Sequence, residues 1–71
     1  MYELWDSESR NRIDEFATER EALAAAALLI ARNPRVYPRG LTLLRWVDDD
    51  YEDVAAGNKL VALIEAHRIP A

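Results

Sequence analysis

The hydrophobic and polar positions divide the chain into segments of different period. Large and charged residues alternate over residues 2–6, and β-branched and aromatic residues return over residues 12–16, after a polar stretch at residues 7–11. Alternation of this kind is typical of strands with one buried face. The two segments are therefore predicted to form a β-hairpin, in which Asn11 is the residue that best tolerates a positive φ.

The clearest helix is predicted to begin at Thr18. Thr18 and Glu21 can form a capping box, in which the hydroxyl accepts from the Glu21 amide and the carboxylate reaches back to the Thr18 amide. Residues 22–31 are apolar and mostly strong helix formers, and Asn33-Pro34 ends the run. Residues 23, 26, 27 and 30 are expected to lie against a sheet. The rest of this apolar helix is either covered by a second helix and a neighbouring chain, or tolerated as small exposed residues.

The second half of the chain predicts a strand, an acidic turn and a second helix. Residues 41–47 are apolar on both faces, which indicates a central, well-buried strand that includes Trp46. Residues 51–55 fit either an edge strand or the first turns of a helix. Gly57 supplies a break and Asn58 an N-cap for a helix over residues 59–67. The expected fold is a small α+β sandwich of order ββαβ(β)α, a mainly antiparallel sheet with two helices on one face.

Length and composition limit this fold to one domain over residues 1–71. The 71 residues are 51% hydrophobic and 31% charged, so the chain is expected to fold. Cysteine is absent, which removes disulfides and thiolate chemistry and fits a reducing compartment. The sequence has neither a signal peptide nor an apolar run of membrane-spanning length, so a cytoplasmic protein with no membrane partner is expected.

The net charge of -4 is unevenly distributed. Residues 1–30 and 48–71 each carry four more acids than bases, whereas residues 31–47 carry four arginines and no acid. The simplest expectation is that these blocks pair as surface ion pairs. The alternative is a patch for an anion or an acidic partner, with four candidate residues: Arg32, Arg35, Tyr37 and Arg39.

Candidate chemistry is sparse. His67 is the only imidazole, and at the end of a helix it is expected to interact with the helix dipole or to pack, so no catalytic triad is proposed. The acidic segment 48–53 fails the calcium-loop pattern at Asp53 and Lys59, which leaves a solvated turn or weak cation binding. The sequence thus predicts no enzyme, no cofactor and no metal site.

Several short motifs carry a resemblance to known proteins. The opening YELWD, the Ser9-Arg10-Asn11 turn, the Phe16-Ala17-Thr18-Glu19 stretch and the following Glu, Ala and Leu residues resemble a set of short, uncharacterised bacterial proteins. Residues 16–23 are also similar to HicB-like antitoxins, in which a hairpin is followed by a Thr-capped helix. The first resemblance implies an autonomous small domain, and the second implies a regulatory role.

The leading functional expectation is a small non-enzymatic interaction module that self-associates, because a domain of this size without disulfides gains little stability from its own core. It would present a sheet face or a helix face to a protein partner or to a second copy as a homodimer. The candidate interface residues lie on the apolar helix: Ala22, Ala25, Ala26 and Leu29. The alternative is an antitoxin-like nucleic-acid binder that uses the arginine-rich segment, and an inhibitor of a host protein is a third class compatible with size and acidity.

Overall fold

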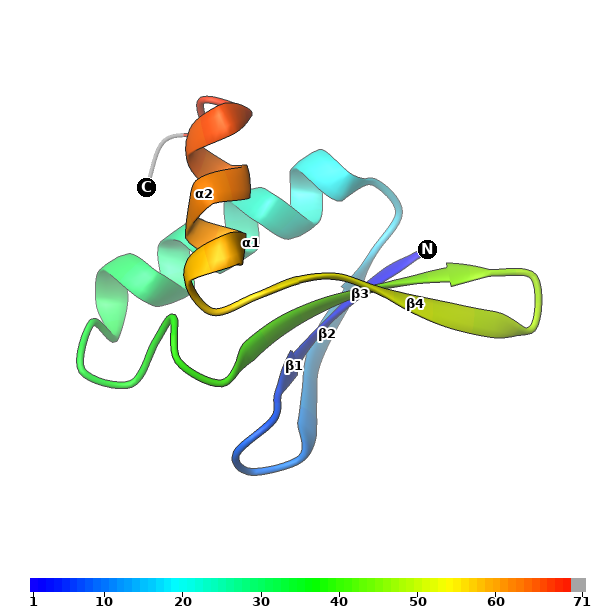
Figure 1. Ribbon diagram of the computed structural model, residues 1–71, viewed down its shortest axis with the longest axis horizontal. Helices are drawn as coiled ribbons and strands as arrows, with labels where there is room; N and C mark the ends of the chain where they lie inside the picture. The colour runs from blue at the N-terminus through cyan, green and yellow to red at the C-terminus, as the bar shows by residue number, and fades with distance from the viewer. Residues whose placement is uncertain (70–71) are drawn as a thin grey trace.

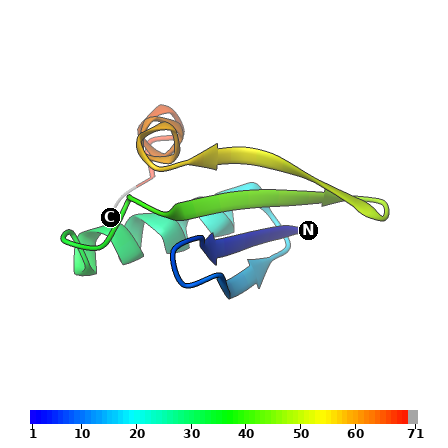
Figure 2. The same cartoon turned by 60° about the horizontal axis from the view of Figure 1, so that its bottom comes forward.

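A computed structural model describes residues 1–69 as a four-stranded antiparallel sheet with two helices packed on one face (Figures 1 and 2). The expected α+β class and element order are confirmed. The elements are β1 (Tyr2–Asp6), β2 (Asn11–Phe16), α1 (Glu19–Arg32), β3 (Leu41–Val47), β4 (Asp50–Ala56) and α2 (Asn58–Ala66).

The strands lie in the order β2-β1-β3-β4, so that β1 and β3 form the centre of the sheet. Leu4 of β1 lies opposite Leu43 of β3, and both side chains are fully buried. The register shifts between Leu4 and Trp5 in the first hairpin, and between Leu43 and Leu44 in the second. Such bulges bend the edge strands and increase their twist.

The core lies between the sheet and the helices. Alternate residues of β1 and β3 point into it, and α1 contributes small side chains that let its backbone approach the sheet closely. Leu60 and Ile64 of α2 and Ile69 after it complete the core. The buried hydrophobic residues are Leu4, Ala22, Leu23, Ala26, Ala27, Leu41, Leu43, Leu60, Ile64 and Ile69.

Both ends of α1 follow from local sequence signals. The Thr18 hydroxyl accepts a 3.2 Å hydrogen bond from the Glu21 amide, which is one of the two bonds of the expected capping box, whereas the Thr18 amide does not donate to the Glu21 carboxylate. At the other end, the Asn33 amide donates to the Leu29 carbonyl at 2.9 Å. The expected limits of this helix are confirmed, because its first and last backbone groups have these partners.

Replacing Thr18 with alanine should lower the free energy of unfolding by about 1 kcal/mol, because the Glu21 amide loses its acceptor. Chemical denaturation would measure the loss. Thr18→Asn is the matched control, since asparagine caps helices at least as well as threonine. Equal stabilities of Thr18→Ala and the native protein would show that this cap contributes nothing.

Four local expectations need correction or completion. Arg10, and not Asn11, takes the positive φ of 60° in the first turn, since Asn11 already begins β2. Gly57 is the N-cap of α2, while Asn58 is its first helical residue. Residues 51–55 belong to strand β4.

The fourth correction concerns Trp46, which is expected in the core. The buried side chains of β3 are those of Leu41 and Leu43, so Trp46 lies half-buried on the face of the sheet opposite the helices.

Candidate functional site

The face of the sheet opposite the helices carries an open groove with a mostly apolar lining. Side chains that alternate with the core residues of β1 and β3 point to this side, and β4 adds two more. They line a shallow groove of about 490 Å³. We call this surface the uncovered face; its residues are Glu3, Trp5, Thr42, Leu44, Trp46, Tyr51 and Asp53.

The aromatic part of the uncovered face lies toward a projecting hairpin. The turn between β3 and β4 extends beyond both helices (Figure 1). Trp46 and Tyr51 are cross-strand partners there, with ring centroids 5.5 Å apart and planes inclined by 56°. Tyr51 is 56% exposed, although an aromatic pair of this kind is more commonly buried or in an interface. This end of the molecule therefore presents aromatic surface to solvent.

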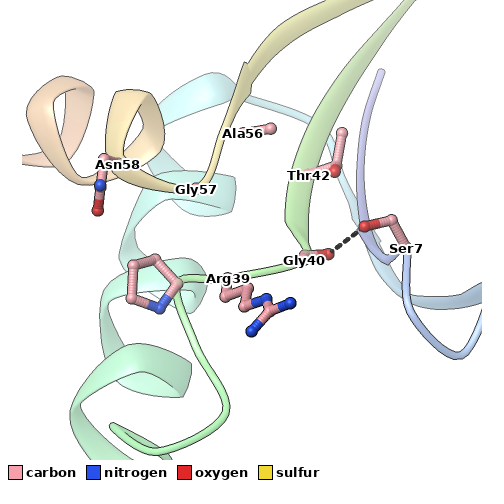
Figure 3. Close-up of a pocket in the computed structure, with 8 residues that line it drawn as sticks. Ser7, Arg39, Gly40, Thr42, Ala56, Gly57 and Asn58 are labelled. Atoms are coloured by element: carbon pink, nitrogen blue, oxygen red, sulfur yellow. Dashed lines mark hydrogen bonds between the residues drawn. The ribbon is translucent and has the colours of Figure 1, made fainter.

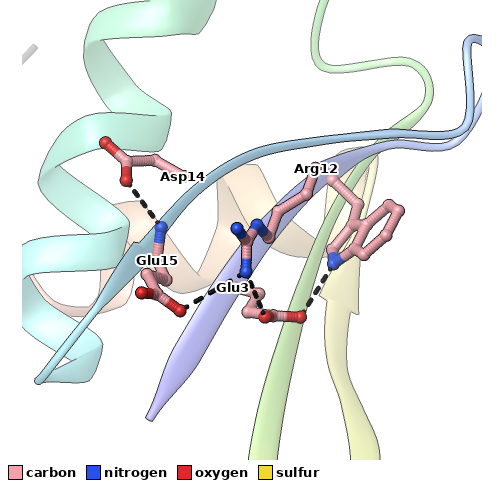
Figure 4. Close-up of polar contacts among 5 residues, drawn as sticks. Glu3, Arg12, Asp14 and Glu15 are labelled. Carbon is pink, nitrogen blue, oxygen red and sulfur yellow. Dashed lines mark hydrogen bonds and ion pairs between the residues drawn. The ribbon is translucent and has the colours of Figure 1, made fainter.

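A buried carboxylate lies at the floor of the groove. Glu3 is only 6% exposed, and its two oxygens accept from the Trp5 indole Nε1 at 3.0 Å and the Arg12 Nη1 at 3.2 Å (Figure 4). Arg12 also contacts Glu15 at 3.4 Å. Within residues 1–69, the buried Nε1 of Trp46 has no hydrogen-bond partner. The hydrogen bonds to Glu3 fix the position of the Trp5 indole on the uncovered face.

The surroundings of Glu3 lower its pKa below the ordinary value of 4.5. The Trp46 indole N–H has the largest effect, although it does not reach the geometry of a hydrogen bond. Burial opposes the shift, and the N–H groups of Trp5 and Arg12 lower the pKa further. The folded state thus favours the charged carboxylate.

A lowered pKa makes stability depend on pH in a defined direction. The contribution of the Glu3 charge is fully present above pH 4.5 and is lost as the pH falls through the lower pKa of the folded state. Glu3→Gln should therefore reduce stability at neutral pH and flatten the loss of stability below pH 4.5, as measured by denaturation across a pH series. Glu15→Gln, which removes an exposed partner of the same Arg12, is the control. An unchanged pH profile for Glu3→Gln would contradict this role.

The candidate residues of the arginine-rich segment have different surroundings. Arg39 pairs with Glu8 at 3.3 Å. It borders a groove that is also lined by Ser7, Gly40 and Asn58 (Figure 3). Arg32 borders a different groove, which lies between α1 and β2. The Tyr37 hydroxyl donates to Asp6 at 3.2 Å. Burial and the charge of Asp6 raise the pKa of Tyr37. Arg35 is exposed on the connecting loop. The expected surface ion pairing thus occurs at Arg39, and also at Arg45, whose Nε lies 3.0 Å from an oxygen of Glu52.

The candidate interface residues of α1 divide into two groups. Ala22 and Ala26 have no exposed surface, because they belong to the buried core, so they offer no surface to a second chain. Ala25 and Leu29 are half-buried and line a groove between α1 and β2. The neighbouring Leu28 is 45% exposed. The expected helix interface is therefore corrected: only its Ala25 and Leu29 part remains accessible.

The acidic turn lies at the tip of the second hairpin. Asp48 adopts a positive φ of 58°, and residues 48–50 are exposed. Across residues 1–69, no group of three or more histidine, aspartate or glutamate side chains is placed to hold a metal ion. His67 is the exposed C-cap residue of α2.

Sequence reasoning missed the uncovered face as a site. The sequence predicts Trp46 in the core and leaves the element that contains Tyr51 undecided, so neither residue is expected on a binding surface. Both become surface residues because the two helices share the other face. The signal that could have found them is the pairing of two aromatic residues across a short acidic turn, which predicts a hairpin with a stacked end.

The chain and its fold were compared with known proteins. None of the helices within the described 69 residues is long and apolar enough to cross a membrane. The resemblances to short bacterial proteins and to HicB-like antitoxins stay predictions. Comparisons with protein-family models, with curated proteins and with solved structures found no match.

Proposed function

We propose that the protein is a small non-enzymatic interaction module that self-associates through the uncovered face of its sheet. The observation that carries this proposal is the aromatic and aliphatic surface of Trp5, Leu44, Trp46 and Tyr51 opposite the helices. Tryptophan and tyrosine are enriched in interfaces and supply much of their binding energy. The carboxylate of Glu3 is engaged by Trp5 and Arg12, which supports a binding role for this face over a catalytic one.

The size of the face supports a weak homodimer. Four strands about 4.8 Å apart and about 20 Å long cover roughly 400 Å². Trp5, Leu44, Trp46 and Tyr51 are the apolar part of this area, beside the polar Glu3, Thr42 and Asp53, and exposed apolar patches often mark interaction sites. Two such faces would bury roughly 800 Å² in total, which is below the area of standard specific interfaces and fits weak, reversible association.

A second copy is favoured as the occupant because the monomer has few internal sources of stability. Five large side chains are fully buried, namely those of Leu4, Leu23, Leu41, Leu43 and Leu60. The chain contains no cysteine for a disulfide. Oligomerisation is one of the ways in which domains below about 80 residues gain stability.

The absolute mass in solution tests the proposal. Light scattering after size exclusion, over a range of loading concentrations and at low and moderate salt, should give a mass that rises from the 8.1 kDa of one chain toward twice that value. A mass of 8.1 kDa at every concentration would contradict self-association. Capture of a different protein by such a monomer would then identify a heterologous partner.

A further inference from the structure

The sheet has two edge strands, β2 and β4, each of which could accept a strand from another chain. The order β2-β1-β3-β4 leaves one side of each without a neighbouring strand among residues 1–69. Five of the six residues of β2 and five of the seven residues of β4 are exposed. Unpaired edges of this kind are templates for strand addition and aggregation, so their outward backbone groups decide how copies associate.

The outward backbone of β4 includes the Tyr51 amide. Tyr51 lies opposite Trp46 of β3, and the Trp46 amide donates to the Met1 carbonyl at 2.8 Å, on the β1 side of that strand. Opposite residues of an antiparallel pair exchange either both backbone hydrogen bonds or none. Trp46 and Tyr51 therefore exchange none, and the Tyr51 amide faces away from the sheet. The Asp50 carboxylate accepts from this amide at 2.8 Å.

The Glu15 amide of β2 has the same arrangement on the other edge. Alternate residues of a strand bond to its two neighbours, so Glu3, two residues after Met1, bonds to β3 as Met1 does. Glu15 lies opposite Glu3, and its amide therefore faces away from β1. The Asp14 carboxylate accepts from it at 2.8 Å (Figure 4). One outward amide on each edge is thus occupied by the aspartate that precedes it.

Bulges and charges oppose strand addition at the same two edges. The register shifts leave Ile13 of β2 and Val54 of β4 without a partner, which bends each edge strand away from a straight added strand. Two β4 edges paired with each other would also bring Asp50 and Asp53 of both copies together, and like charges directly opposite are destabilising. Both edges therefore combine features by which native sheets avoid edge-to-edge association.

We infer that Asp14 and Asp50 determine the specificity of association, because they close the two edges to strand addition and confine self-association to the uncovered face. Each occupies an amide that an added strand would use, and each places a charge on its edge. Association through the face is complete with two copies, whereas strand addition at both edges leaves a free edge on every assembly and continues. The confinement to the face rests on the proposed self-association, and the closure of the edges stands without it.

The double variant Asp14→Ala, Asp50→Ala tests this inference. Both positions are exposed, so the variant should fold as the native protein does, which circular dichroism checks. Sedimentation velocity should show species above twice the mass of one chain, at concentrations at which the native protein shows none. Hydrogen exchange read by mass spectrometry should show added protection in β2 and β4 of these species, because an added strand engages outward amides that a face-to-face contact leaves free.

Asp49→Ala combined with Glu65→Ala is the matched control, since it makes the same change in net charge at two exposed positions, in the β3–β4 turn and on α2. It should keep the native mass distribution. Equal assembly of this control, a native distribution for the double variant, or larger species without protection in β2 and β4 would each overturn the closure of the edges. If the native protein is monomeric at every concentration and the double variant still assembles through its edges, the closure stands and the proposed self-association through the face falls.

Discussion

Tyr51→Glu should convert the self-associated protein into a monomer without unfolding it. Tyr51 is 56% exposed, so the fold does not depend on its burial, yet it packs against Trp46 at the hairpin end of the proposed interface. A glutamate in its place removes aromatic contact area and would desolvate a charge on association. An aromatic residue at an interface hot spot contributes about 2 kcal/mol or more, so the dissociation constant should rise roughly thirtyfold.

Leu28→Glu is the matched control for this prediction. Leu28 is 45% exposed on α1, and the substitution adds the same charge to the opposite side of the molecule. The two variants therefore separate an interface on the sheet from one on the helix. If Leu28→Glu dissociates the protein and Tyr51→Glu does not, the interface lies on α1.

Ala26→Glu should unfold the domain. Ala26 is completely buried in the core, so a glutamate there must either bury its carboxylate or push the surrounding elements apart. A buried charge without a partner costs several kcal/mol, and domains below about 80 residues rarely have more than about 3–5 kcal/mol of stability. The cooperative unfolding transition seen by circular dichroism should disappear.

Ala31→Glu provides the comparison for Ala26→Glu. Ala31 is exposed on the same helix, so the same substitution there should cost no more than about 1 kcal/mol, including the unfavourable charge near the helix C-terminus. A folded, monomeric Ala26→Glu variant would show instead that Ala26 lies in an interface between chains.

The helix α1 illustrates what the sequence could predict. Its start at the Thr18 cap and its end before Pro34 depend on contacts within one helical turn, so local residues determine them. The face that it buries depends on where the sheet and α2 lie. Ala22 was therefore expected on the surface although it is in the core, since a helix with apolar residues all around gives no preferred side.

Strand β3 shows the same limit for the candidate site. Its apolar residues on both faces predicted burial on both faces, and a central position in the sheet is confirmed. However, both helices pack on one side, which leaves Leu44 and Trp46 on the other. The pairing of β4 with β3 then brings Tyr51 to Trp46 and Asp53 to Leu44. These are long-range consequences of topology, and no local pattern specifies them.

The central claim is that the uncovered face is the surface through which two copies associate. The most direct test is a dilution series of ¹⁵N-labelled protein followed by NMR, because the two indole N–H groups of the chain, in Trp5 and Trp46, both lie on that face. The account predicts concentration-dependent shifts of both indole signals and of the β3 and β4 amides around residues 44 and 51. Shifts confined to α1, or none over the whole concentration range, would contradict it.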